Sequence, residues 1–148
     1  MKKTVLTVMA AALLAAGACA RKEPGLVFSV GGAPNEVEVW ESLAARFGAE
    51  KGFKISVVRQ PTDSDQRRQG VLVPLKAAKP DPDVFLADIA WLPQLAASGW
   101  LEDLAPYAAA DGTDIKAFWP NVVQQADIQP GGELAALPVY VDAGLLYY

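Results

Sequence analysis

Short apolar runs alternate with helix-like stretches along this chain, and that alternation restricts the possible folds more than any other feature. Residues 26–30 and 53–59 have strand patterns, and the compact run 83–87 is typical of a buried strand. Residues 36–50 carry apolar side chains at helical spacing. Strands separated by helices form right-handed βαβ units, which assemble into parallel sheets. We therefore predict an α/β fold with a mostly parallel sheet flanked by helices.

Several residues predict where the first helices begin and end. Asn35 can cap the first helix, with Glu38 completing a box-like start, and Gly52 is placed to end it. Residues 61–65 supply turn and capping residues before a second helix. These signals place one helix after each of the first two strands.

The pattern is weaker toward the C-terminus. Residues 91–98 predict a helix that Gly99 ends, and Pro106 interrupts the chain before a helix predicted around residues 114–119. Gly131-Gly132 predicts a turn, with strand on both sides of it.

The N-terminus has the layout of a secretory signal. Lys2 and Lys3 precede the apolar run 5–14, and small residues continue to Cys19. This run is shorter than the roughly 18 apolar residues of a membrane-spanning helix, so we expect a signal peptide over residues 1–18 rather than a permanent span. A core helix at the start of the chain is the alternative.

Cys19 is the only cysteine, and residues 14–19 resemble the lipobox of bacterial lipoproteins, although Ala16 stands where that motif usually has Leu. The resemblance implies a lipidated cysteine as the first mature residue, a tether over residues 19–25 and anchoring to the membrane. The alternative is a cysteine removed with the signal or left just after the cleavage point. With no second cysteine, no internal disulfide is expected.

Charge and residue types exclude several classes of function. Removal of the signal leaves 11 basic and 17 acidic residues without a basic cluster, which disfavours a nucleic-acid partner. The chain has no histidine, which excludes Ser-His-Asp and Cys-His catalysis and the usual zinc sites. Residues 111–114 lack the rest of a calcium loop and are better explained as a helix cap. We expect no metal and no cofactor, while a glycosidase carboxylate pair remains an alternative.

Charged side chains follow each predicted strand. Glu36 follows the first strand, Arg67 the second and Asp88 the third. In doubly wound sheets the ligand crevice lies beyond the carboxyl ends of the strands. Aromatic faces beside carboxylates suit a sugar, because ring C–H groups lie on the π face and ionised oxygens accept hydrogen bonds from hydroxyls. Glu36, beside the turn Gly31-Gly32, would repel a phosphate but could bind a neutral polyol.

Four segments carry a family resemblance: residues 35–40, 82–91, 97–104 and 137–148. In their order and spacing the chain resembles the extracellular solute-binding proteins of ABC importers, in the sugar-binding group that includes maltose- and trehalose-binding proteins. The resemblance implies that residues 26–148 are the N-terminal lobe of a periplasmic-binding-protein-like fold, including the start of the crossing between lobes. Members have two lobes that close over the ligand, so we expect a fragment that lacks the second lobe.

The resemblance also implies a set of ligand contacts. The predicted ligand-binding residues are Glu36, Arg67, Asp88, Trp91, Tyr140 and Asp142. Arg67 is the least specific of these assignments, because Arg68 or Asp65 could take its role. Trp40 and Trp100 lie inside apolar patterns and are expected to pack rather than to bind.

Simpler explanations of these residues stay open at the level of sequence. Glu36 could favour the helix dipole, and Asp88 could cap the helix that it precedes. Trp91 could either pack or stack on a ligand. Tyr140 and Asp142 could be ordinary residues of an edge strand.

Together with these patterns, the resemblance implies the carbohydrate receptor of an ABC sugar importer. It would bind a mono- or oligosaccharide in a cleft between two lobes, deliver it to the permease subunits and catalyse no reaction. It would be exported and held at the extracytoplasmic or periplasmic face of the membrane by a lipidated Cys19. A secreted carboxylate-dependent glycosidase and a structural lipoprotein without ligand are the alternatives.

Overall fold

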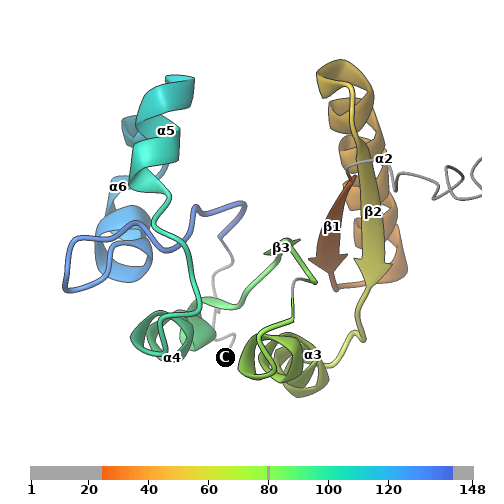
Figure 1. Ribbon diagram of the computed structural model, residues 1–148, viewed down its shortest axis with the longest axis horizontal. Coiled ribbons are helices and arrows are strands. Elements are labelled where there is room, and N and C mark those ends of the chain that lie inside the picture. The colour runs from red at the N-terminus through yellow and green to blue at the C-terminus, as the bar shows by residue number, and fades with distance from the viewer. Residues whose placement is uncertain (1–24, 80, 142–148) are drawn as a thin grey trace, which may run out of the picture.

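The structure of the protein, a computed structural model, describes residues 25–79 and 81–141 (Figure 1). The predicted signal, Cys19 and Asp142 lie outside these residues. None of the helices in the described part is both long and apolar enough to cross a bilayer.

Three parallel strands form the sheet. β1 (Gly25–Val30) lies in the centre, with β2 (Lys54–Arg59) on one side and β3 (Val84–Phe85) on the other. Helices connect the strands, as βαβ units require. The predicted α/β fold with a parallel sheet flanked by helices is confirmed.

The helix after β1, α2 (Pro34–Lys51), starts earlier than predicted. Its N-cap is Ala33, and a proline is the first helical residue. The predicted cap by Asn35 and Glu38 is therefore wrong, because the fixed φ of proline suits the first helical position and moves the start upstream. Gly52 ends α2 with a left-handed φ of 78°, as predicted.

α2 packs on the sheet through small and aromatic residues. Its buried residues are Val37, Ala44 and Gly48. Trp40 meets Phe28 of β1 edge to face, with ring centroids 5.9 Å apart. Trp40 therefore packs, as predicted.

An ion pair on the surface also joins α2 to β2. Arg59 donates from Nε and Nη2 to the two carboxylate oxygens of Glu41, at 2.7 and 2.6 Å. These hydrogen bonds hold the pKa of the Glu41 carboxyl below its usual value. Because water reaches both side chains, the pair contributes little to stability.

The second helix, α3 (Ser64–Lys76), follows β2 as predicted. Asp63 caps it, and its carboxylate accepts a hydrogen bond from Gln66 N at 2.8 Å. β3 is shorter than the predicted run 83–87, and Val84 is 51% exposed. Within the described residues β3 pairs only with β1, so it is an edge strand and not the buried strand that was predicted.

α3 and α4 (Leu92–Ala97) lie side by side in Figure 1 and share the main hydrophobic cluster. Leu72, Trp91 and Leu95 are its buried members, and Trp100 packs against it, as predicted. The helix predicted over residues 91–98 is α4, which starts one residue later because Trp91 belongs to the preceding 3-10 helix η1 (Ile89–Trp91). Gly99 follows α4 with a φ of 66° and ends it, as predicted.

The helix α5 (Ala105–Asp111) was missed by the sequence patterns. Pro106 lies in its first turn, where proline is tolerated, and does not interrupt the chain there. Gly112 ends α5, and Asp114 caps the next short helix. The interpretation of residues 111–114 as a helix cap is therefore confirmed.

Only short elements follow α5. The helix predicted around residues 114–119 is the 3-10 helix η2 (Ile115–Ala117). It leads to α6 (Pro120–Val122) and the π-helical turn η3 (Val123–Asp127). The turn at Gly131-Gly132 is present, but within the described residues a single antiparallel bridge between Ile128 and Leu134 replaces the predicted strands beside it.

Asp103 connects the start of α5 to the chain after this turn. Its Oδ1 accepts hydrogen bonds from Ala105 N and Leu134 N, both at 3.0 Å. Leu104 N also donates to Leu134 O at 2.9 Å. These bonds fix the C-terminal segment against α5.

Asp127 makes the stability of this segment depend on pH. It is 3% exposed, and its Oδ2 has no hydrogen-bond partner among the described residues. Burial raises the pKa of the Asp127 carboxyl above its ordinary value of 3.8. As pH rises past the ordinary value, the unfolded chain releases this proton first, so ionisation favours unfolding.

Asp127→Asn should therefore be more stable than the parent protein at neutral pH, and this advantage should shrink in acid, where both states of the parent keep the proton. Urea denaturation of both proteins across a pH series measures the difference in unfolding free energy. A difference that stays constant at all pH values would contradict the buried carboxylate as its cause.

Candidate ligand-binding site

The loops that follow the three strands start side by side. Gln60 N donates to Val30 O at 2.7 Å, and Leu86 N donates to Ser29 O at 3.0 Å, so both outer chains stay paired with β1 beyond the strand ends. Because the strands are parallel, the loops leave at the same edge, where open α/β sheets bind ligands. We call this region the carboxyl edge; it comprises the loop residues 31–33, 60–63 and 86–88 together with the side chains of Glu36 and Arg67, which lie against residues 31–33.

Glu36 lies at the carboxyl edge and is bound to the turn before α2. Its Oε2 accepts a hydrogen bond from Ala33 N at 2.8 Å. Gly32 has a φ of 147°, and a side chain there would overlap the Glu36 carboxylate. Glu36 is exposed, so its carboxylate keeps acceptor positions for ligand hydroxyls.

Arg67 reaches the same turn from α3. A Cβ built on Gly31 would overlap Cδ of Arg67 and would lie 3.1 Å from Cγ and 3.2 Å from Nη1. Arg68 points elsewhere, since its Nη2 donates to Gln94 of α4. The structure therefore brings Arg67, and not Arg68, against the turn that also binds Glu36.

Asp88 ends the loop after β3. Its Oδ1 accepts a hydrogen bond from Ala90 N at 3.0 Å and thereby caps η1. Asp88 therefore caps a helix, as the simpler explanation from the sequence predicted. The residue is exposed, and a carboxylate that caps through one oxygen retains further acceptor capacity.

The remaining three predicted site residues have different surroundings. Trp91 is 7% exposed and packs in the hydrophobic cluster with Leu72, so its ring is not presented to a ligand. Tyr140 is 63% exposed. Asp142 lies outside the described residues. Of the six predicted site residues, the structure therefore places Glu36, Arg67 and Asp88 at the carboxyl edge.

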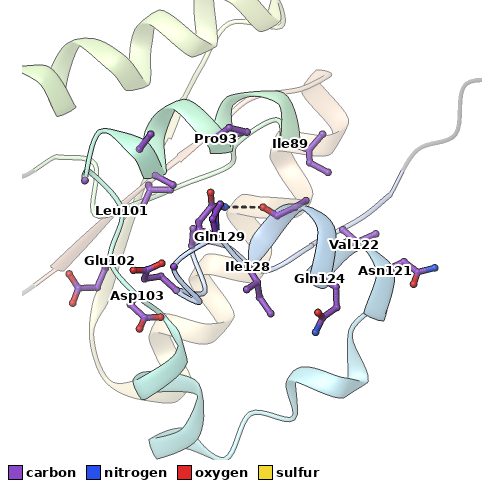
Figure 2. A pocket seen from close by; sticks show the side chains of 18 residues that line it. Ile89, Pro93, Leu101, Glu102, Asp103, Asn121, Val122, Gln124, Ile128 and Gln129 are labelled. Carbon is purple, nitrogen blue, oxygen red and sulfur yellow. Dashed lines mark hydrogen bonds between the residues drawn. The ribbon is translucent and has the colours of Figure 1, made fainter.

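A wide groove of about 1270 Å³ lies between α4 and the segment from α6 to Glu133 (Figure 2). Ile89, which directly follows Asp88, lines it, as do the acidic side chains of Glu102 and Asp103. Inside it, Gln129 Nε2 donates to a backbone carbonyl at 3.1 Å. Sequence patterns missed this groove, because it forms where the C-terminal segment folds back, which no local periodicity encodes.

The acidic groups at the carboxyl edge do not form a metal-binding cluster. Within residues 25–79 and 81–141, no three acidic side chains are grouped closely enough to hold a metal ion. Each acid at the edge instead accepts a hydrogen bond from a nearby backbone amide. This arrangement suits the binding of hydroxyl groups.

Comparison with known proteins decides the family. The sequence model of the bacterial extracellular solute-binding proteins matches residues 33–148. The chain belongs to this family. The family assignment confirms the resemblance seen in the sequence and is consistent with an exported protein.

One sequence relative and one solved structure of similar fold show how much of such a protein this solute-binding chain spans. A probable ABC transporter-binding protein of Deinococcus radiodurans is 34% identical over 105 residues, which cover 71% of this chain and 24% of that protein. The solved structure of maltose-bound T. maritima MalE3 matches with a TM-score of 0.64 and 23% identity, covering 74% of this chain and 27% of that one. The chain thus spans about a quarter of the length of each of these two proteins.

Proposed function

We propose that this solute-binding protein is the carbohydrate receptor of an ABC importer, and that its described residues form most of the N-terminal lobe. The family supports ligand binding without catalysis. The D. radiodurans relative supports an ABC transporter as the partner, and the fold of maltose-bound MalE3 supports a mono- or oligosaccharide as the ligand.

The observation that carries this proposal is the assembly at the carboxyl edge. Glu36 and Arg67 contact one glycine turn, and Asp88 follows the neighbouring strand. Carboxylate acceptors beside a guanidinium donor match the paired hydroxyl groups of a sugar, each of which both donates and accepts. Tyr140 and Asp142 would add contacts from the crossing toward a second lobe.

Transport would depend on closure of two lobes. A ligand held at the carboxyl edge and also bound by a facing lobe favours the closed form by its differential affinity. The permease subunits would then recognise that form. Cys19, as a lipidated first residue, would keep the receptor at the extracytoplasmic face of the membrane, and mass spectrometry of the mature N-terminus tests this anchor.

Asp88→Asn in the full-length protein tests the site. Asparagine keeps the capping oxygen but removes the charge that strengthens a hydrogen bond to a sugar hydroxyl. The affinity for the bound sugar should fall about tenfold or more, while the melting temperature stays unchanged. Titration followed by tryptophan fluorescence measures the affinity.

Asp114→Asn is the matched control. Asp114 caps η2 through the same kind of hydrogen bond, from Lys116 N at 3.0 Å, but it does not belong to the carboxyl edge. The Asp114→Asn variant should therefore have the same sugar affinity and the same melting temperature as the parent protein. If the Asp88→Asn protein bound the sugar as tightly as the parent does, the proposed site would be wrong. If the parent protein released reducing ends from the sugar, the glycosidase would be favoured instead.

A further inference from the structure

Gly31 and Arg67 are in closer contact than any ordinary side chain at position 31 would permit. Gly31 is buried at the end of β1, and the arginine stem crosses directly over its α-carbon. A methyl group there would overlap Cδ and would lie 3.2 Å from Nη1. The guanidinium could then keep its present position only if the stem moved.

The requirement for glycine at this position is one of space and not of backbone conformation. Gly31 is absent from the described residues with positive φ, whereas the neighbouring Gly32 has a φ of 147°. Alanine can therefore adopt the backbone conformation of Gly31. The methyl group of alanine would, however, overlap the stem of Arg67.

Arg67 has donors that the described protein leaves unsatisfied. Its buried Nε has no hydrogen-bond partner among the described residues, and no ion pair to Arg67 occurs there. Ser29, two residues before Gly31, is 3% exposed, and its Oγ also lacks a partner in that part of the chain. Both atoms are enclosed by the protein and are therefore not themselves open to a ligand. Because no ion pair or hydrogen bond of Nε fixes the arginine in the described part of the chain, the packing of its stem on Gly31 sets its position.

We propose that Gly31 is a positioning residue of the ligand site. By lacking a side chain it lets the stem of Arg67 cross the end of β1, and it thereby fixes where the guanidinium presents its donors to the acceptor oxygens of the sugar. The inference rests on the proposed receptor function, and it assigns to Gly31 an effect on affinity that acts entirely through Arg67.

A double-mutant cycle tests this in the full-length protein, with the sugar that the parent binds most tightly as the probe. Gly31→Ala and Arg67→Gln should each weaken binding about 10- to 100-fold. The double variant should bind no more weakly than Arg67→Gln alone, because Gly31 has nothing left to position. Losses that multiply in the double variant would overturn the proposal, as would a Gly31→Ala protein with parental affinity.

Two control variants separate positioning from general damage. Val73→Ala trims an exposed side chain on α3, the helix that carries Arg67, and Arg46→Gln removes an exposed charge from α2; both should keep parental affinity. A parent protein that binds no sugar at all would instead refute the proposed function.

A second variant covers the case in which Gly31→Ala fails to fold. Shortening the overlapping stem with Arg67→Ser in the same chain should then restore cooperative unfolding, because the space above position 31 becomes available. A double variant that stays unfolded would show that Gly31 is needed for a reason other than Arg67 and would overturn the proposal.

Discussion

Leu95→Ala should lower the free energy of unfolding by about 2–5 kcal/mol, the usual range for a leucine truncated in a packed core. Leu95 is 1% exposed and lies with Leu72 and Trp91 in the cluster that joins α3 to α4. The loss combines the transfer free energy of the removed atoms with the cavity that remains. Urea denaturation followed by tryptophan fluorescence measures it, with Trp91 as a reporter inside the cluster.

Two substitutions calibrate this result. Leu95→Met keeps the volume and should cost less than about 1.5 kcal/mol. Val73→Ala, at a position of α3 that is 60% exposed, should change stability by less than about 0.5 kcal/mol. If Leu95→Ala were as mild as Val73→Ala, the cluster would not be the core that connects the two helices.

Gly48→Ala should destabilise the protein by about 1–3 kcal/mol, although alanine normally stabilises a helix relative to glycine by about 1 kcal/mol. Gly48 lies inside α2, and a Cβ there would stand 2.6 Å from the carbonyl oxygen of Phe53. That oxygen belongs to the backbone just before β2, so it cannot rotate away as a side chain would. Either the helix or the strand must shift.

Gly70→Ala is the appropriate comparison, because Gly70 also lies in a helix and its added methyl group would meet only the end of the Gln60 side chain. It should be neutral or slightly stabilising by the ordinary helix preference. If α2 and β2 approach each other as closely as the structure shows, Gly48→Ala should lower the melting temperature, whereas Gly70→Ala should leave it unchanged or raise it slightly. Stabilisation by Gly48→Ala would contradict it.

Local periodicity was enough to predict the first half of the fold. β1, α2 and β2 follow directly from apolar spacing and from Gly52, since each signal lies within the element that it defines. The start of α2 was wrong because proline at the first helical position outweighed the capping preference of Asn35. Such competition between neighbouring signals is decided only by their exact backbone geometry.

The second half was harder because its structure depends on distant contacts. The strands predicted beside Gly131-Gly132 reduce to a single bridge, and Leu134 is held instead by Asp103 and Leu104. Pro106 was interpreted as a break, although a proline in the first turn is compatible with a helix. Pairings over such separations leave no periodic trace in the sequence.

The candidate site likewise has one part that the sequence predicts and another that depends on tertiary contacts. Parallel topology alone predicts that residues after successive strands meet at one edge, and Glu36, Arg67 and Asp88 do follow the three strands there. The burial of Trp91 depends on how α3 packs on α4, and the contact between Gly31 and Arg67 depends on one rotamer. Neither could be obtained from spacing.

The receptor function is tested most directly by calorimetry of the full-length protein with a panel of mono- and oligosaccharides, with each mixture also analysed for reducing ends. Receptor function predicts saturable heat with at least one sugar and no product after prolonged incubation. Saturable heat accompanied by hydrolysis, or no heat with any sugar of the panel, would contradict it.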